Sequence, residues 1–314
     1  MKLLTLIKTN FNHHVSMDLY YEFEGKIIEK GTWEIVNGVG SFQAKIVRQI
    51  LKILPPIKLP FKKDKNYVVI GYQKEKFFPF LHFRAKSKSI WMYDAWEPLF
   101  KDIEKTINNY NLNYIFTASK QSADYLNTLG IKNFKAAWIP EAVGASKYEF
   151  IDYKKREIDV LQLGRRWNDY HSKIKEIERD FNYKYEKKAG EIIFNTRQDF
   201  ITGLANSKIS ICVPSTITHP NVTGSISTIT NRYLQSMASR CLILGKLPYD
   251  LPFLFDYNPI IEIDDENPVE QIKTILANYD SYIPLIEKNY ETIKNHHNWS
   301  QRANQIENFL AENN

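Results

Sequence analysis

The sequence has little cysteine: its 314 residues include two, Cys212 and Cys241. Each lies inside an apolar run, so both are expected in the core as small hydrophobic side chains. A disulfide is therefore not expected, and two cysteines alone cannot form a metal site. Zinc-type spacings, an HExxH motif and a nucleophile elbow are also missing, and the histidines are too scattered to indicate a metal centre.

Long apolar runs are also missing. No stretch approaches the ~18 apolar residues that a membrane-spanning helix needs. The apolar part of Met1–Lys8 is too short for a signal peptide. We therefore expect a cytoplasmic protein, in which any membrane contact is peripheral.

Neither sign of charge is in large excess. The 42 Lys and Arg residues against 36 Asp and Glu residues give a net charge of +6, which is too small to indicate nucleic acid. The hydrophobic share of 43% and the charged share of 25% are ordinary for globular proteins. They exclude a mainly disordered chain, a collagen-like chain and a small disulfide scaffold. Aromatic residues, at 14%, are abundant, and they fill cores but also line sugar and base sites.

Short apolar stretches alternate with amphipathic helical stretches along the chain. This alternation predicts an α/β protein whose parallel sheets are covered by helices on both faces. The polar stretch 144–157 has no clear period and separates a domain at 1–150 from a second at 151–295. Strands are expected at 67–71, 89–93, 114–117, 134–139, 159–163, 208–213, 241–244 and 260–263.

Ligands of open parallel sheets bind outside the carboxyl ends of the strands, so the residues that follow each strand are the candidates for a binding site. Gly164, Arg165 and Arg166 come directly after the strand at 159–163. A glycine there permits a tight turn, a helix N-terminus presents free N–H groups, and arginines suit phosphate. We interpret the segment as a diphosphate cradle, although its spacing matches neither a P-loop nor GxGxxG. The alternative is a glycine turn with two solvated arginines.

The loop 214–231 follows the strand at 208–213 and is rich in hydroxyl side chains. Loops of this length are usually functional or mobile. It leads into a helix expected to begin near Thr230 and Asn231, so that Arg232 is a candidate for a phosphate and Gln235 for a ribose or sugar hydroxyl. The alternative is an N-capped helix with a surface arginine.

Three residues are candidates for a general base. Asp94 follows the strand at 89–93, where a carboxylate can take the proton of an acceptor hydroxyl. The alternative is that Asp94 caps the helix that begins near Trp96. Glu141 follows Pro140, and His14 lies in a polar loop after the first strand, where histidines are more often simply solvated.

Two further segments have an ordinary and a functional interpretation. Residues 264–267 look like a metal motif, but Asn267, Pro268 and Glu270 favour a capping box at the start of a helix. Residues 45–65 mix aliphatic side chains with seven Lys and Arg residues and one acid. For the helical part of this segment, we favour ordinary packing of its aliphatic face on the first sheet. For the Pro-Lys run that follows, we favour binding to an anionic membrane surface, which attracts each nearby basic residue by about 1 kcal/mol.

These strand-end segments resemble the GT-B glycosyltransferases, which have two Rossmann-like domains facing a cleft. The second half is similar to the "glycosyl transferases group 1" type, close to the CgeB-like set. The resemblance spans about 89 to 310, and the segments that carry it are 160–166 with Tyr170 and His171, 230–239 with 241–245, and 115–119 with 138–141.

The resemblance implies that the second domain holds a nucleotide-diphosphate sugar, with Gly164, Arg165 and Arg232 facing the diphosphate. Arg166, Thr230, Asn231 and Gln235 complete the implied donor site. Many retaining members have acids where Ser227 and Gln235 stand, which weakens a retaining assignment. The family usually needs no metal, so no cofactor is expected. The helix at 296–314 is expected to pack back on the first domain.

We therefore expect a metal-independent glycosyltransferase of the hexosyl type. Its acceptor would be a hydroxyl of a glycan or lipid-linked glycan in bacterial surface polysaccharide synthesis (capsule or O-antigen). The main alternative is a non-catalytic binding or coat protein that keeps the fold, for which the missing acids are the best support. A nucleic-acid or membrane scaffold acting through 45–65 is a third hypothesis, and the small net charge argues against nucleic acid.

Overall fold

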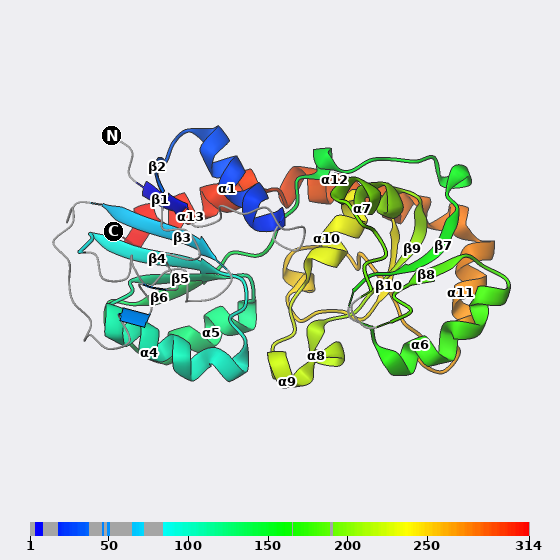
Figure 1. Ribbon diagram of the computed structural model, residues 1–314, viewed down its shortest axis with the longest axis horizontal. Coiled ribbons are helices and arrows are strands. Elements are labelled where there is room, and N and C mark those ends of the chain that lie inside the picture. Colours follow the sequence, from blue (N-terminus) through cyan, green and yellow to red (C-terminus); the bar gives the residue numbers. More distant parts are fainter. Residues whose placement is uncertain are drawn as a thin grey trace. The chain divides into compact units, whose positions relative to one another are not determined.

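The computed structural model describes residues 4–8, 18–37, 46, 49–50, 65–71, 84–164, 166–188 and 191–313. The chain forms two compact α/β units (Figure 1). Unit 1 comprises Met1–Pro140, Val222–Ile226 and Trp299–Asn314, and unit 2 comprises Glu141–Asn221 and Ser227–Asn298. Unit 1 is thus built from three separate stretches of the chain.

Unit 1 contains a six-stranded parallel sheet in the order β2-β1-β3-β4-β5-β6. The strands predicted in this half are confirmed to within two residues at each end. The inner three of them are largely buried on both faces, as parallel sheets require, whereas the edge strand at 135–138 is partly exposed. The strands are β1 (Leu4–Lys8), β2 (Glu34–Asn37), β3 (Asn66–Gly71), β4 (Ser87–Met92), β5 (Tyr114–Thr117) and β6 (Lys135–Trp138).

The helices of unit 1 cover this sheet with apolar side chains. Ile103 and Ile107 of α4 pack into the same core as Ile90 and Ile115 of the strands. Ser119 caps α5 by accepting the backbone N–H of Ser122. The helices are α1 (Asp18–Lys30), the short 3-10 turn η3 (Glu97–Leu99), α4 (Phe100–Tyr110), α5 (Lys120–Thr128) and α13 (Trp299–Asn313).

Helix α13 packs against α1, so distant parts of the sequence lie side by side in unit 1 (Figure 1). The Trp299 ring stacks on Phe23 with 4.7 Å between centroids, and its indole N–H donates to the Glu22 carboxylate at 3.1 Å. The ring of Phe309 meets the edges of Tyr114 and Phe116 on β5. These contacts make the C-terminal helix part of the N-terminal unit's core.

Unit 2 contains a five-stranded parallel sheet in the order β11-β10-β9-β7-β8. The predicted strands are again confirmed to within two residues, whereas β8, a short strand of aromatic and charged residues, was not predicted. The strands are β7 (Ile158–Gln162), β8 (Tyr183–Tyr185), β9 (Ser207–Cys212), β10 (Leu242–Gly245) and β11 (Ile261–Glu262).

Helices cover both faces of the unit 2 sheet. Ile174 of α6 and Ile272 of α11 pack on one side, while Leu234 of α10 and Ile293 of α12 pack on the other. The helices are η4 (Ala145–Lys147), η5 (Tyr153–Lys155), α6 (Asn168–Ile174), η6 (Lys175–Arg179), α7 (Arg197–Ala205), α8 (Ser215–Thr218), α9 (Pro220–Thr223), α10 (Asn231–Ala238), η7 (Leu251–Phe253), α11 (Pro268–Ala277), η8 (Tyr279–Tyr282) and α12 (Ile283–His296). Both cysteines are buried and free, as predicted.

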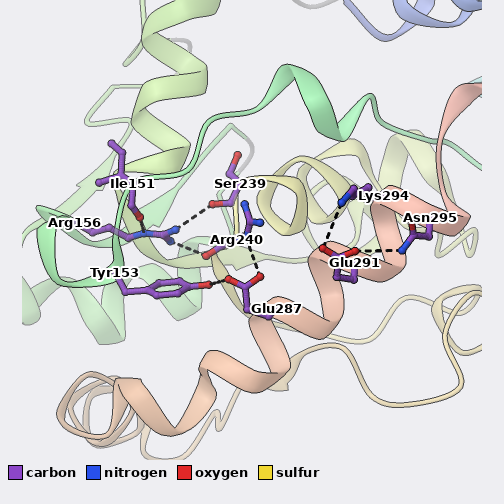
Figure 2. A network of polar contacts seen from close by, with 9 residues as sticks. All are labelled: Ile151, Tyr153, Arg156, Ser239, Arg240, Glu287, Glu291, Lys294 and Asn295. Atoms are coloured by element: carbon purple, nitrogen blue, oxygen red, sulfur yellow. Dashed lines mark hydrogen bonds and ion pairs between the residues drawn. The ribbon is translucent and has the colours of Figure 1, made fainter.

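A buried arginine fixes the C-terminal end of α10 in unit 2. Arg156, 3% exposed, donates to the carbonyls of Ser239 (3.4 Å) and Arg240 (2.6 Å), which follow the helix, and to that of Ile151 (3.0 Å) (Figure 2). Glu287 of α12 then accepts from Arg240 and from the Tyr153 hydroxyl. The network ties the first residues of unit 2 to α10 and α12.

The loop 214–231 contains the single-turn helices α8 and α9 and leads into α10 at Asn231, where the sequence predicted a helix start. One local prediction in unit 2 was wrong. The side chain of Asn267 does not cap α11; instead, Asp264 accepts the backbone N–H groups of Glu266 (2.9 Å) and Asn267 (3.0 Å). Those two bonds lower the pKa of the Asp264 carboxyl. Among the described residues, no three His, Cys, Asp or Glu side chains are grouped so that they could hold a metal ion.

Most of the basic segment 45–65 lies outside the described residues. Of its aliphatic residues, Ile46 and Ile50 are described, and they are 46% and 51% exposed. Of the helices in the described ranges, none is both long enough and apolar enough to cross a bilayer.

Candidate functional site

The first turn of α10 is hydrogen-bonded to the carboxyl ends of three strands of unit 2. The Arg232 guanidinium donates to the carbonyl of Leu163, directly after β7, at 2.8 Å. The Tyr233 hydroxyl is shared between the carbonyls of Cys212, the last residue of β9 (2.9 Å), and Lys246, directly after β10 (2.7 Å). Side chains on this turn therefore lie at the sheet edge where ligands of such folds bind.

Gly164 and Arg232, two of the predicted phosphate-site residues, are neighbours. Gly164 has a φ of +66°, which L side chains rarely adopt, so the predicted tight turn is present. A Cβ built on Gly164 would lie 3.6 Å from Nη1 of Arg232. The turn after β7 and the guanidinium thus form one surface.

Thr230 precedes α10 and has an unused hydroxyl. Its side chain makes no capping hydrogen bond, and its buried Oγ1 has no hydrogen-bond partner among the described residues. Asn231 and Gln235 are half-buried on the same helix, with Gln235 one turn beyond Arg232. A helix start with an arginine and a hydroxyl that makes no hydrogen bond to the described residues suits a phosphate group.

The other predicted arginines are placed differently. Arg166 donates to the Asn168 side chain at 3.1 Å and to the carbonyl of Glu186, just after β8, at 2.9 Å. Its guanidinium is therefore engaged at the β8 side of the sheet. Arg165 lies outside the described residues, and so does His14.

The histidine next to this site is neutral. Burial, together with the charge of Arg166, lowers the pKa of His171 to about 4. Its Nδ1 lies 2.8 Å from the Tyr183 hydroxyl, which donates to the Gln162 side-chain oxygen at 2.5 Å. The positive charge of the site therefore comes from arginine. Burial also raises the pKa of the Cys212 thiol, so this cysteine stays protonated and is no nucleophile at neutral pH.

Sequence reasoning missed the buried carboxylate of Asp250, which is 0% exposed. One of its oxygens accepts the backbone N–H of Ile229 at 2.7 Å, and the other accepts the Thr228 hydroxyl. Burial raises the pKa of Asp250 to about 6. Asp250 lies in the segment after β10. The expectation that ligands bind beyond the carboxyl ends of strands, which singled out Gly164, could therefore have singled out Asp250 as well.

The candidate bases lie in both units. Asp94 is half-buried, two residues beyond the end of β4 in unit 1. The N-cap position of the next helical turn, η3, is held by Trp96, which makes no side-chain capping bond. Glu141 begins unit 2 and is 6% exposed. Their catalytic roles stay predictions.

Comparison with known proteins finds relatives only through structure: no family model and no curated protein matches the sequence. HepE of Anabaena, in complex with UDP and glucose, matches with a TM-score of 0.60 and 8% identity over 98% of this chain and 99% of its own. Sucrose-phosphate synthase from Thermosynechococcus elongatus matches with a TM-score of 0.62 and 10% identity over 98% of each chain. A glycosyltransferase from Rickettsia africae matches with a TM-score of 0.55 and 11% identity over 100% of this chain and 99% of its own. With both sheets parallel and helix-covered, the chain has the GT-B fold, built from two Rossmann-like domains.

Proposed function

We propose that this protein is a glycosyltransferase that moves a sugar from a nucleoside-diphosphate sugar to a hydroxyl group. The observation that carries the proposal is the contact of Arg232 with the Gly164 turn at the carboxyl edge of the unit 2 sheet. A diphosphate could accept hydrogen bonds there from Arg232, from the Thr230 hydroxyl and from the start of α10. Because the matching HepE structure holds UDP and glucose, a UDP-sugar is the first donor to test.

The proposed reaction makes one bond and breaks one. The acceptor oxygen attacks the anomeric carbon of the sugar, and the bond from that carbon to the diphosphate breaks. The nucleoside diphosphate leaves with added negative charge, which Arg232 and the helix start would stabilise without a metal ion. The acceptor proton passes to a base, for which Asp94 is our first candidate, because Glu141 is more deeply buried. His14 is the remaining candidate.

We assign the donor to unit 2 and the acceptor to unit 1, as expected for domains at 1–150 and 151–295. The acceptor is proposed to be a glycan or lipid-linked glycan of a bacterial surface polysaccharide, and the transferred group a hexose. The basic segment 45–65, with seven Lys and Arg residues against one acid, supports peripheral contact with an anionic membrane.

Nucleotide binding tests the proposal directly. Thermal unfolding is followed with UDP, GDP, CDP and dTDP, since a ligand at 100 times its Kd stabilises the folded state by about 2.7 kcal/mol. We expect UDP to raise Tm, and Arg232→Ala to weaken its binding at least tenfold, or about 1.4 kcal/mol. Unchanged binding in Arg232→Ala, or no response to any of the four nucleotides, would overturn the proposal.

The second candidate function is a binding protein without turnover. It is favoured by Ser227 and Gln235, which stand where many retaining members have acids. Its signature is nucleotide binding that depends on Arg232 together with no release of UDP from UDP-glucose, whether or not glycan acceptors are present. Release of UDP that requires an acceptor rejects it.

A further inference from the structure

Tyr233 is the side chain that holds α10 to two strands at once. It is 0% exposed, and its single hydroxyl proton is shared between the carbonyls of Cys212 and Lys246. The strand ends are tightly packed at this point, because a Cβ on Gly245 would lie 2.0 Å from the Cys212 carbonyl oxygen. The hydroxyl therefore fixes the helix against a rigid base.

Asp250 holds the segment that enters α10. Its carboxylate accepts the Ile229 N–H and the Thr228 hydroxyl, one and two residues before the Thr230 cap position. An ionised carboxylate with no exposed surface is costly in a protein interior. What the carboxylate does here is fix the backbone of the segment that leads into α10.

The two contacts lie on either side of Arg232 in the chain. Arg232 lies between the Asp250-bound segment and Tyr233, and its guanidinium reaches the Leu163 carbonyl and the Gly164 turn. Helix α10 has only eight residues, so a shift of its first turn moves the guanidinium with it. Displacement of a binding group by about 1 Å is enough to change binding or rate by tenfold or more.

We propose that Tyr233 and Asp250 are positioning residues that lock the first turn of α10 and thereby set the affinity of the Arg232–Gly164 site for a nucleotide's diphosphate. The inference rests on the proposed function and adds two residues to its site. Neither side chain need touch the ligand, so each acts through Arg232.

The test compares two tyrosines, Tyr233 on α10 and Tyr279 on η8, whose hydroxyls donate to carbonyls of the same strand, β9. Tyr233→Phe removes the hydroxyl at the carboxyl end of β9, and Tyr279→Phe removes one that donates to the Lys208 carbonyl, near the amino end of β9, at 2.9 Å. Both variants lose a buried hydrogen bond, so we expect both to lower Tm. Only Tyr233→Phe should raise the Kd for UDP, about tenfold, in calorimetric titrations well below Tm.

Variants of Asp250 provide a second test, in which a conservative substitution should restore the binding that a truncation weakens. Asp250→Ala should raise the Kd for UDP about tenfold. Asp250→Asn keeps an oxygen for the Ile229 N–H and offers an N–H₂ group to the Thr228 oxygen, so it should bind within threefold of wild type. This pair also decides the question if Tyr233→Phe does not fold.

The outcomes separate the two proposals. If wild type binds none of UDP, GDP, CDP and dTDP, both proposals fall. If wild type binds UDP and Arg232→Ala does not, but Tyr233→Phe matches Tyr279→Phe and Asp250→Ala matches wild type, then the positioning role is rejected and the proposed function stands.

Discussion

The Glu97 carboxylate accepts the backbone N–H of Ser225 at 2.6 Å, joining residues 128 positions apart within unit 1. The neighbouring Ile226, 4% exposed, packs into the same core as Phe100 and Ile115. Residues 222–226 are therefore an integral part of unit 1, although the chain on either side of them belongs to unit 2. The bonds from Ser225 lower the pKa of Glu97, which keeps its carboxylate ionised in this contact.

Replacing Gly224 should destabilise unit 1. Its φ is +61°, and a Cβ would lie 2.3 Å from the Glu97 carboxylate oxygen, so Gly224→Ala adds both strain and a steric clash. We expect a loss of about 1–3 kcal/mol in the free energy of unfolding, measured by urea titration. The matched control is Gly25→Ala in the exposed part of α1, where a Cβ meets nothing within 4 Å and helix propensity predicts a small gain. Equal effects of the two variants would contradict the assigned contact.

Asp250 should make stability depend on pH. Because its pKa is raised from 3.8 to about 6, the folded state binds a proton more tightly than the unfolded state does. The stability that this group contributes is fully present below pH 3.8 and is lost as the pH rises through about 6. The loss amounts to about 3 kcal/mol.

Asp250→Asn cannot ionise, so its free energy of unfolding relative to wild type should rise between pH 4 and pH 7. Taking the difference between the two proteins removes the contribution of other titrating groups. A difference that does not change with pH would show that Asp250 has an ordinary pKa.

Arg156 should be essential for the stability of unit 2. Arg156→Met keeps the apolar stem but removes the donor of the carbonyls that follow α10 and of the carbonyl of Ser207, the first residue of β9, which accepts at 2.8 Å. Each buried acceptor left unsatisfied costs about 1–3 kcal/mol, so a total loss of at least about 3 kcal/mol is expected in denaturant titrations. Arg179→Met, at an exposed position on η6, serves as the control and should change little. A loss below 1 kcal/mol for Arg156→Met would be inconsistent with the network in Figure 2.

Asp94 should act on turnover and not on donor binding. Loss of a general base lowers the rate about 10²–10⁴-fold, so Asp94→Asn should reduce acceptor-dependent release of UDP at least a hundredfold. Its Kd for UDP should equal that of wild type, because the donor is assigned to unit 2. Asp102→Asn, at an exposed position on α4, is the matched control. Wild-type turnover in Asp94→Asn would transfer the role of base to another residue.

The sequence predicted the parts of the fold that depend on apolar patterning. The runs that became β3, β5, β7 and β9 are strongly apolar and short, and parallel strands require both properties. It did not predict β8, because Tyr183 and Tyr185 alternate with a lysine on an edge strand and resemble loop residues. Edge strands have a weaker pattern than central ones because one side lacks a partner.

The sequence could predict site residues whose position follows from a single strand end. It could not predict residues whose role depends on contacts between several strand ends. Gly164 and Arg232 were selected separately by the strand-end rule, and the structure places them in contact. The roles of Tyr233 and Asp250 depend on carbonyls and N–H groups from other stretches of the chain, which spacing in one sequence does not reveal. The start of α11 is a similar case. The Asp264 side chain, three residues before Asn267, accepts the Asn267 backbone N–H, and the Asn267 side chain does not cap the helix.

The three-part make-up of unit 1 has a consequence for synthesis of the chain. The first strands leave the ribosome before residues 222–226 and well before α13, whose Phe309 covers Tyr114 and Phe116. The nascent N-terminal sheet therefore keeps aromatic side chains uncovered while the whole of unit 2 is translated, the interval in which partly folded chains aggregate most readily. Completion of unit 1 thus waits for α13, and separating the units by cutting at residue 140 would leave the first one without that helix.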